Sequence, residues 1–277
     1  MAGKTIPPED YLEPRCLLCN EEPGAAQIRS IPQRRVIEKL DEYMSRRDYA
    51  GAERHLLYWL SEAELGHDLR GRLLVCNELV GHYRKTREKE KAFSFAEQAL
   101  ELLKTQKMED SVSAGTTFVN AATAYSAFGE NLRALELFRK AKEIYESHPQ
   151  TRAELLGGLY NNMALDCVAL GKFAEAYALY DRAMEIMQSV PGGALEQAIT
   201  CLNRADAVTA EKGFEEAEKQ VFALVDRAYE LLKQADAPHD GYYAFVCEKC
   251  APGFSYYGYF AAAEELKKEA ERIYARN

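Results

Sequence analysis

A pattern of small and aromatic residues recurs along most of this chain and constrains its fold more than any other feature. In the segment 134–141, Ala134 is followed by Phe138 and then by Ala141, and the segment 176–183 repeats the pattern 42 residues later with Tyr180 as the aromatic residue. The first small residue recurs at intervals of 40 to 46 residues, at Ala52, Ala92, Ala134, Ala176, Ala217 and Ala263. Self-similarity at such a period is typical of repeat architectures, so we predict six copies of one structural unit.

Each unit is predicted to be a pair of antiparallel helices. Small residues at fixed places let two helices approach closely, and the aromatic side chains fill the space toward the next pair. A turn lies about five residues before each first alanine, and these turns fall at Arg47, Arg87, Gly129, Gly171, Gly213 and Gly258. Runs of Val, Ile and Thr bounded by Asn-Gly or Asp-Gly turns are missing, which disfavours strands. The six hairpins are expected at residues 33–65, 70–106, 112–148, 153–190, 194–236 and 240–277.

These units resemble the tetratricopeptide repeat (TPR), a helical hairpin with a signature of small and aromatic positions. The resemblance covers roughly residues 33–277 and is closest in the fourth unit, where Tyr160, Ala164, Gly171, Ala176, Tyr180 and Ala183 occupy the family positions in order. The long period, with Asn just before the small residues, is similar to the kinesin-light-chain-like branch. The resemblance implies an all-α fold, a right-handed α-α superhelix (solenoid) of about six TPR-like helical hairpins.

Residues 1–32 differ from the rest of the chain in composition. Five of the nine prolines fall there and no helical period is found, so we expect an irregular N-terminal arm. Pro252, followed by Gly253, lies inside an otherwise helical pattern, and we expect the last hairpin to be kinked or broken at that point.

Composition and motifs exclude several classes of function. The chain carries 35 Lys and Arg against 44 Asp and Glu, and this formal net charge of −9 opposes binding to nucleic acid or to an anionic membrane. No apolar run is long enough to span a bilayer and the first residues lack the apolar stretch of a signal peptide, so a cytoplasmic protein is expected. Metalloprotease, nucleotide-binding and serine-hydrolase motifs are missing, and the five histidines show no ligand spacing. The sequence therefore predicts a protein that is not an enzyme and needs no cofactor.

Asparagines on the first helix of each hairpin are the candidate ligand contacts, because in such a superhelix these helices line the concave groove. Asn120, Asn162 and Asn203 each lie two residues before a small residue and are expected to form a ladder. An amide offers a donor and an acceptor to the backbone of an extended peptide, and the resemblance implies the same use. The alternative is that these amides bond to neighbouring helices. Asn77 and Asn161, one residue earlier on the turn, are further candidates.

Three cations are candidate partners for an acidic group on a ligand. Arg84 and Lys85 lie late in the first helix of the second hairpin, and Arg204 adjoins Asn203. The alternative interpretation is that each of them belongs to a solvated helix face.

The seven cysteines divide into two groups. Cys76, Cys167 and Cys201 fall at positions that face a helix–helix seam. The other four form two C-x-x-C pairs, Cys16 with Cys19 in the arm and Cys247 with Cys250 in the last hairpin. Four thiolates in two such pairs are the ligand set of a structural zinc site. The alternatives are that Cys247 and Cys250 are seam residues and the arm cysteines loop thiols, or that the pairs are redox-active.

A binding module for a protein or peptide partner is the function that these patterns favour, with an extended peptide in the concave groove. The alternative is a self-contained sensor or scaffold whose N-terminal arm occupies the groove, pinned through the zinc site. The eight aromatic residues between Tyr242 and Phe260 are expected to cap the last hairpin, or alternatively to form the floor of a peptide pocket.

Overall fold

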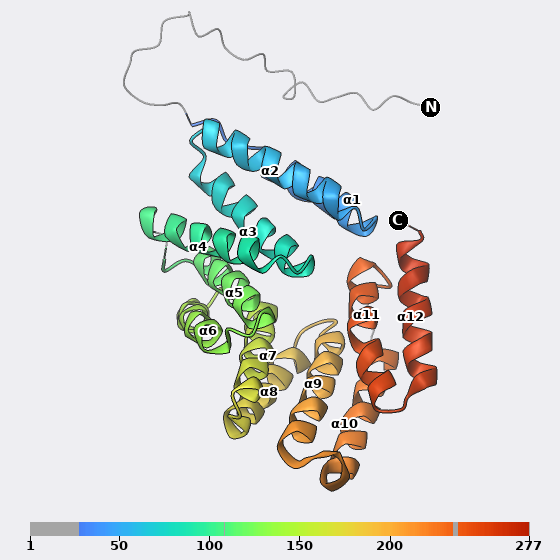
Figure 1. Cartoon of the computed structure of the whole chain (residues 1–277). Coiled ribbons are helices and arrows are strands. Elements are labelled where there is room, and N and C mark those ends of the chain that lie inside the picture. Colours follow the sequence, from blue (N-terminus) through green and yellow to red (C-terminus); the bar gives the residue numbers. More distant parts are fainter. Residues whose placement is uncertain (1–27, 108, 235–237, 277) are drawn as a thin grey trace, which may run out of the picture.

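The computed structural model describes residues 28–107, 109–234 and 238–276, and this part of the chain contains helices but no strand. The helices follow one another as hairpins: α1 (Gln33–Ser45) with α2 (Tyr49–Leu65), α3 (Leu69–Lys85) with α4 (Lys89–Thr105), α5 (Val112–Ala127) with α6 (Asn131–Ser147), α7 (Ala153–Ala169) with α8 (Phe173–Gln188), α9 (Ala194–Lys212) with α10 (Phe214–Gln234), and α11 (Gly241–Tyr256) with α12 (Phe260–Tyr274). The predicted all-α solenoid is confirmed (Figure 1).

The turn inside each hairpin places one residue in the left-handed backbone region. Four of these residues are glycines, for example Gly129 with φ of 84°, which adopt this conformation without steric penalty. In the first two hairpins Arg47 (φ 56°) and Arg87 (φ 65°) take the same conformation. For a residue with a Cβ atom this region costs about 1 to 2 kcal/mol, so the packing of the first two hairpins must offset that cost.

The repeated small residues lie where the two helices of a hairpin meet the next hairpin. Ala52, Ala92, Ala134, Ala176, Ala217 and Ala263 are all buried. Between them the aromatic residues Phe138 and Tyr180 are completely inaccessible to solvent. At Gly115 in α5 the approach is closer still, because a Cβ atom there would lie 2.4 Å from the ring of Tyr145 in α6. Small residues therefore fix the spacing and aromatic residues fill it.

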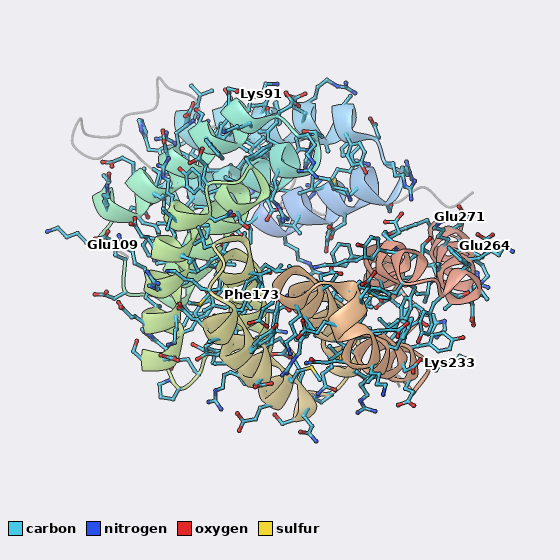
Figure 2. The ribbon with its side chains drawn as sticks, turned by 60° about the horizontal axis from the view of Figure 1, so that its bottom comes forward. Lys91, Glu109, Phe173, Lys233, Glu264 and Glu271 are labelled. Carbon is cyan, nitrogen blue, oxygen red and sulfur yellow. The ribbon has the colours of Figure 1, made fainter. Side chains whose placement is uncertain are left out.

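The solenoid curves so that its odd-numbered helices lie inside the bend. Each odd-numbered helix from α3 to α9 contacts the next odd-numbered helix as well as its own hairpin partner. The even-numbered helices lie outside, and the labelled Lys91 of α4 lies at the outer surface (Figure 2), where its ammonium is 3.0 Å from Oε1 of Glu53 in α2. In both views the N-terminal hairpin, in blue, lies beside the C-terminal hairpin, in red. The curvature therefore brings the two ends of the repeat array together.

The chain enters the first hairpin across the turn between α2 and α3. The backbone N–H of Arg29 donates to the carbonyl oxygen of Gly66 (2.9 Å), and that of Ile31 donates to Oδ2 of Asp68 (2.9 Å). Asp68 also caps α3 by accepting from the N–H of Gly71 (2.9 Å). Residues 28–32 are thus fixed on the repeat array, whereas residues 1–27 of the predicted arm lie outside the described residues.

Helix α11 runs without interruption through Pro252, so the expected break at this residue is wrong. Proline lacks the N–H that would bond the carbonyl oxygen of Glu248 one turn earlier. Pro252 and Glu248 are both exposed, so solvent is able to satisfy that oxygen. None of the helices in the described residues has the length and apolar character needed to span a membrane.

Candidate functional site

Two cavities hollow the concave side of α3 and share the side chain of Glu78. The first, which we call the ring cavity, has a volume of about 640 Å³ and lies between α1, α3 and α11. The second, the amide cavity, has a volume of about 410 Å³ and lies between α1, α3 and α5. Cavities of this size are typical of ligand sites. The residues discussed below that line them are Asp41, Glu78, Gly81, His82, Arg84, Lys85 and Phe245 in the ring cavity, and Asn77, Glu78, Thr116 and Asn120 in the amide cavity.

Two of the predicted amides meet in the amide cavity. The side chain of Asn77 donates to Oγ1 of Thr117 (3.0 Å) and to the carbonyl oxygen of Leu73 (3.0 Å), and its Oδ1 accepts from Nδ2 of Asn120 (3.1 Å). Asn77 thereby orients Asn120. The Oδ1 atom of Asn120 has no partner among the described residues, so an acceptor is left for a ligand N–H.

A second set of amides repeats this arrangement two hairpins later. Oδ1 of Asn161 in α7 accepts from Nδ2 of Asn203 (3.1 Å) and from Oγ1 of Thr200 (3.2 Å), both in α9. Asn161 is only 4% exposed, so it supports its neighbours and does not face solvent. Asn162 is half-buried and makes no hydrogen bond with the described residues. Asn77 with Asn120 and Asn161 with Asn203 are thus bonded across neighbouring helices, as the alternative interpretation predicts, whereas ligand contact by Asn120, Asn162 and Asn203 stays a prediction.

Arg84 is the candidate cation without a partner among the described residues. Its side chain lines the ring cavity, and burial lowers the pKa of its guanidinium, with no charged neighbour to counteract that effect. Lys85 lines the same cavity, and its ammonium lies 5.5 Å from the ring centre of Tyr49. Arg204 instead pairs with Asp181 of α8, so its charge is already compensated.

Two carboxylates that the sequence did not single out line the same cavity. Burial raises the pKa of Glu78, and the nearby carboxylate of Asp41 raises it further. Burial also raises the pKa of Asp41. These shifts mean that neither acid has a cation close enough to reverse the effect of burial. The ring cavity therefore holds uncompensated charge of both signs.

The aromatic residues of the last hairpin divide into buried and exposed ones. Tyr243, Phe254 and Tyr257 are buried and close the core of the hairpin, as the capping interpretation predicts. Tyr242, Phe245, Tyr256 and Phe260 are exposed, and Phe245 lines the ring cavity opposite Leu40 and Met44 of α1. One residue of this group thus serves the alternative interpretation, an aromatic wall of a pocket.

The five cysteines in the described residues are all buried. Burial raises the pKa of Cys247 to about 11 and that of Cys250 to about 12. Zinc requires thiolates, so these two thiols in the core of the last hairpin are poorly suited to ligation. Among the described residues no group of three or more His, Cys, Asp and Glu is placed to hold a metal. Cys16 and Cys19 lie outside the described residues, and the four-cysteine zinc site stays a prediction.

Burial of the thiols predicts low reactivity in the folded protein. In a variant with serine at positions 16 and 19, we expect none of the five remaining thiols to react with Ellman's reagent at about pH 8, where a thiol of pKa 11 is on the order of 0.1% thiolate. All five are expected to react after denaturation. Elemental analysis of the unaltered chain provides the companion measurement. About one zinc per chain, lost in the serine variant, would support the four-cysteine site and contradict the seam interpretation.

Comparison with known proteins fits this geometry. Residues 155–221, which run from α7 into α10, match the tetratricopeptide repeat family. The resemblance to the tetratricopeptide repeat is thus confirmed for this segment. None of the curated protein sequences matches the chain.

Among solved structures, this chain is similar to kinesin light chain TPR-like repeats from Podosopora anserina. A single-residue variant of that protein is 19% identical, with 74% of this chain and 95% of that chain covered and a TM-score of 0.50. The parent protein is also 19% identical, with 74% of this chain and 96% of that chain covered and a TM-score of 0.49. BtubC (BKLC) from P. vanneervenii is 18% identical, with 89% of this chain and 92% of that chain covered and a TM-score of 0.47. At these identities the likeness shows the fold alone.

Several residues of the two cavities and the two amide pairs were not predicted from the sequence, for identifiable reasons. Thr117 and Thr200 stand 83 residues apart, as do Asn120 and Asn203, so this shared spacing is a signal that points to the threonines. Glu78 stands 42 residues before Asn120, at the repeat position of Asn120, Asn162 and Asn203, but it is not an amide and so was passed over. Asp41 and Phe245 follow no pattern that the other hairpins share. They come together through the curvature of the solenoid, which the periodicity does not report.

Proposed function

We propose that this protein is a non-catalytic binding module that holds an extended peptide, or an extended segment of a partner protein, against the concave side of α1, α3 and α5. The observation that carries the proposal is the pair of cavities that share Glu78 and so lie next to each other along α3. A peptide backbone needs donors and acceptors at regular intervals, and Asn120, oriented by Asn77, presents its amide oxygen in the amide cavity.

Gly81 supplies a way to block this site without disturbing the fold. It lies inside α3 and lines the ring cavity, and a Cβ atom added there would meet no atom within 4 Å. Glycine inside a helix costs roughly 0.5 to 1 kcal/mol relative to alanine, so no packing contact explains its presence here. Room for a ligand does explain it.

We expect Gly81→Trp to abolish peptide binding while leaving the protein folded, because the indole fills the ring cavity. The measurement is selection of a random 12-residue peptide library on immobilised protein. The unaltered chain is expected to enrich peptides and the variant is not. Glu136→Trp, which puts the same bulk on an exposed position of the outer helix α6, is the matched control and is expected to enrich the same peptides as the unaltered chain. Equal enrichment by Gly81→Trp would place binding elsewhere.

The alternative, in which the N-terminal arm occupies the groove, is tested on the same peptides. Residues 28–32 are fixed beside the start of α1, and Gln33 lines the amide cavity, so the arm begins next to the proposed site. For an open groove, deletion of residues 1–27 is expected to leave the affinity for a selected peptide unchanged. A rise of about tenfold or more would show that the arm competes with the ligand.

A further inference from the structure

The two ends of the solenoid are joined by a contact between residues 201 positions apart. Arg47, in the turn between α1 and α2, places its Nη2 atom 2.5 Å from Oε1 of Glu248 in α11. The same guanidinium lies 5.4 Å from the ring centre of Tyr274, whose hydroxyl donates to Oε2 of Glu248 (3.2 Å). One residue of the first hairpin thus contacts both helices of the last hairpin, at the place where the two hairpins lie side by side in Figure 1 and Figure 2.

This end-to-end contact holds one wall of the ring cavity in place. The cavity is walled by α1 and α3 on one side and by Phe245 of α11 on the other. Phe245 reaches it only because α11 is held against the first hairpin, one helical turn from Glu248 on the same helix. Both partners of the ion pair are largely solvated, with 59% of the Arg47 side chain and 41% of the Glu248 side chain exposed. Such a pair is weak, so the ends are able to separate and admit a ligand.

Charge is distributed unevenly inside the ring cavity. Asp41 and Glu78 form its acidic part, since the carboxylate of Asp41 is close enough to raise the pKa of Glu78. Arg84 lies six residues beyond Glu78 on α3, and its charge shifts the pKa of neither acid. The cavity therefore has an acidic part and a basic part that do not neutralise each other. A ligand that carries both charges at the matching distance would satisfy both parts at once.

His82 and Gly81 add a polar group and open space to the same cavity. His82 is 5% exposed, and its Nδ1 atom, which has almost no accessible surface, has no hydrogen-bond partner in the described residues. A ligand contacts that atom only if the imidazole turns toward the cavity. Gly81, next to His82 in the sequence, leaves open space, because a Cβ atom there would meet no atom within 4 Å.

We propose that the ring cavity is a binding site, completed when the first hairpin closes on the last, for a dipolar stretch of peptide that brings a basic side chain to Asp41 and Glu78 and an acidic side chain to Arg84. Phe245 contacts the apolar part of that stretch. This inference rests on the proposed peptide-binding function and adds to it the charge pattern of the ligand and the coupling to closure.

Selection on charge-reversal variants tests the charge pattern. The probe is the random 12-residue library, and the unaltered chain is expected to enrich peptides with one basic and one acidic residue at a constant spacing. Glu78→Lys is expected to replace the preference for the basic residue by a preference for an acidic one. Arg84→Glu is expected to replace the preference for the acidic residue by a preference for a basic one. If Glu78→Lys does not fold, Glu78→Gln is used instead and is expected to weaken the selected peptide about tenfold. Unchanged preferences in folded variants would overturn the proposal.

Charge exchange across the closure tests the coupling. Arg47→Glu sets two acids against each other and is expected to weaken the selected peptide about fivefold, and Arg47→Glu with Glu248→Arg is expected to restore it to within about twofold. Arg139→Glu, which breaks an exposed ion pair with Glu175 between neighbouring outer helices, is the control and is expected to change nothing. An affinity unaffected by Arg47→Glu would overturn the coupling.

The outcomes separate this inference from the function on which it rests. Peptides that are enriched by the unaltered chain and lost with Gly81→Trp, but carry no dipolar pattern, would refute the inference and keep the proposed function. Failure of the unaltered chain to enrich any peptide would count against both.

Discussion

Replacing Phe138 by alanine is expected to lower the free energy of unfolding by about 3 to 5 kcal/mol, the range measured for truncating a buried aromatic residue. Phe138 is completely buried in α6, at the aromatic position of the third repeat. Truncation leaves a cavity beside Ala134 and Ala141, whose helix is held by the hairpins on both sides. In a repeat array each hairpin is stabilised by its neighbours, so the loss weakens the interfaces of the third hairpin with the second and the fourth.

Leu132→Ala is the matched control, because Leu132 lies on the same helix and is 65% exposed. Its replacement is expected to change stability by no more than about 0.5 kcal/mol. Urea denaturation followed by circular dichroism measures both variants, and hydrogen exchange shows where the array opens. Similar losses for Phe138→Ala and Leu132→Ala would mean that the aromatic positions do not carry the interfaces between hairpins, and the packing account given above would be wrong.

The hairpin pattern was predictable because it depends on local rules. Residues four apart on a helix share a face, so an alanine followed by an aromatic residue four positions later defines one buried stripe. The turns were equally visible, even where glycine is absent. Arg47 and Arg87 were assigned to turns from spacing alone, and both occupy the left-handed region that the glycines take in the other hairpins.

The closure of the solenoid was not predictable from the same rules. It depends on small rotations between successive hairpins that add up over the whole array, and none of them leaves a mark in the sequence. Arg47 is an ordinary charged residue in a turn and Glu248 one in the middle of a helix, until the curvature brings them together. The ring cavity, which needs Phe245 from the last hairpin, was hidden for the same reason.

The asparagines show the limit of counting along a helix. Asn161 and Asn162 are adjacent, and one residue turns the side chain by about 100° around the helix axis. Repeat spacing favoured Asn162, yet Asn161 is the residue that bonds to Asn203. In the second hairpin, Asn77 is the residue that bonds to Asn120 of the third hairpin, and Asn77 stands 84 residues before Asn161. The amides thus repeat over two hairpins, and a search for one position per hairpin finds only half of each pair.

Asp166 gives the second large expected effect, and its environment explains why. The carboxylate lies on α7 and is 1% exposed. Its Oδ1 accepts from the hydroxyl of Ser126 on α5 (2.7 Å), while Oδ2 has no hydrogen-bond partner in the described part of the chain. Burial raises the pKa of Asp166 from 3.8 to about 6, and the bond from Ser126 offsets part of that rise. The folded state therefore favours the protonated acid more than the unfolded state does.

The sign of the pH dependence follows from linkage. Because the folded pKa lies above the unfolded value, the stabilising effect of the bound proton is fully present below about pH 4 and is lost as the pH rises through about 6. One pKa unit corresponds to 1.36 kcal/mol, so the ionised carboxylate costs up to about 3 kcal/mol at neutral pH. Asp166→Asn removes this titration but leaves the two N–H groups of the new amide without a partner in the described residues, which takes back about 1 to 2 kcal/mol.

We therefore expect Asp166→Asn to raise the free energy of unfolding by about 1 to 2 kcal/mol at about pH 7.5 and to give no gain at about pH 4. Denaturation of both proteins at several pH values isolates this residue, because shifts at His82, Asp41 and Glu78 cancel in the difference. Ser126→Ala is the companion variant. It removes the bond that lowers the pKa of Asp166, so the midpoint of the pH-dependent loss is expected to move upward. A gain for Asp166→Asn of equal size at both pH values would show that the carboxylate is not titrating, and that its burial is compensated by a partner outside the described residues.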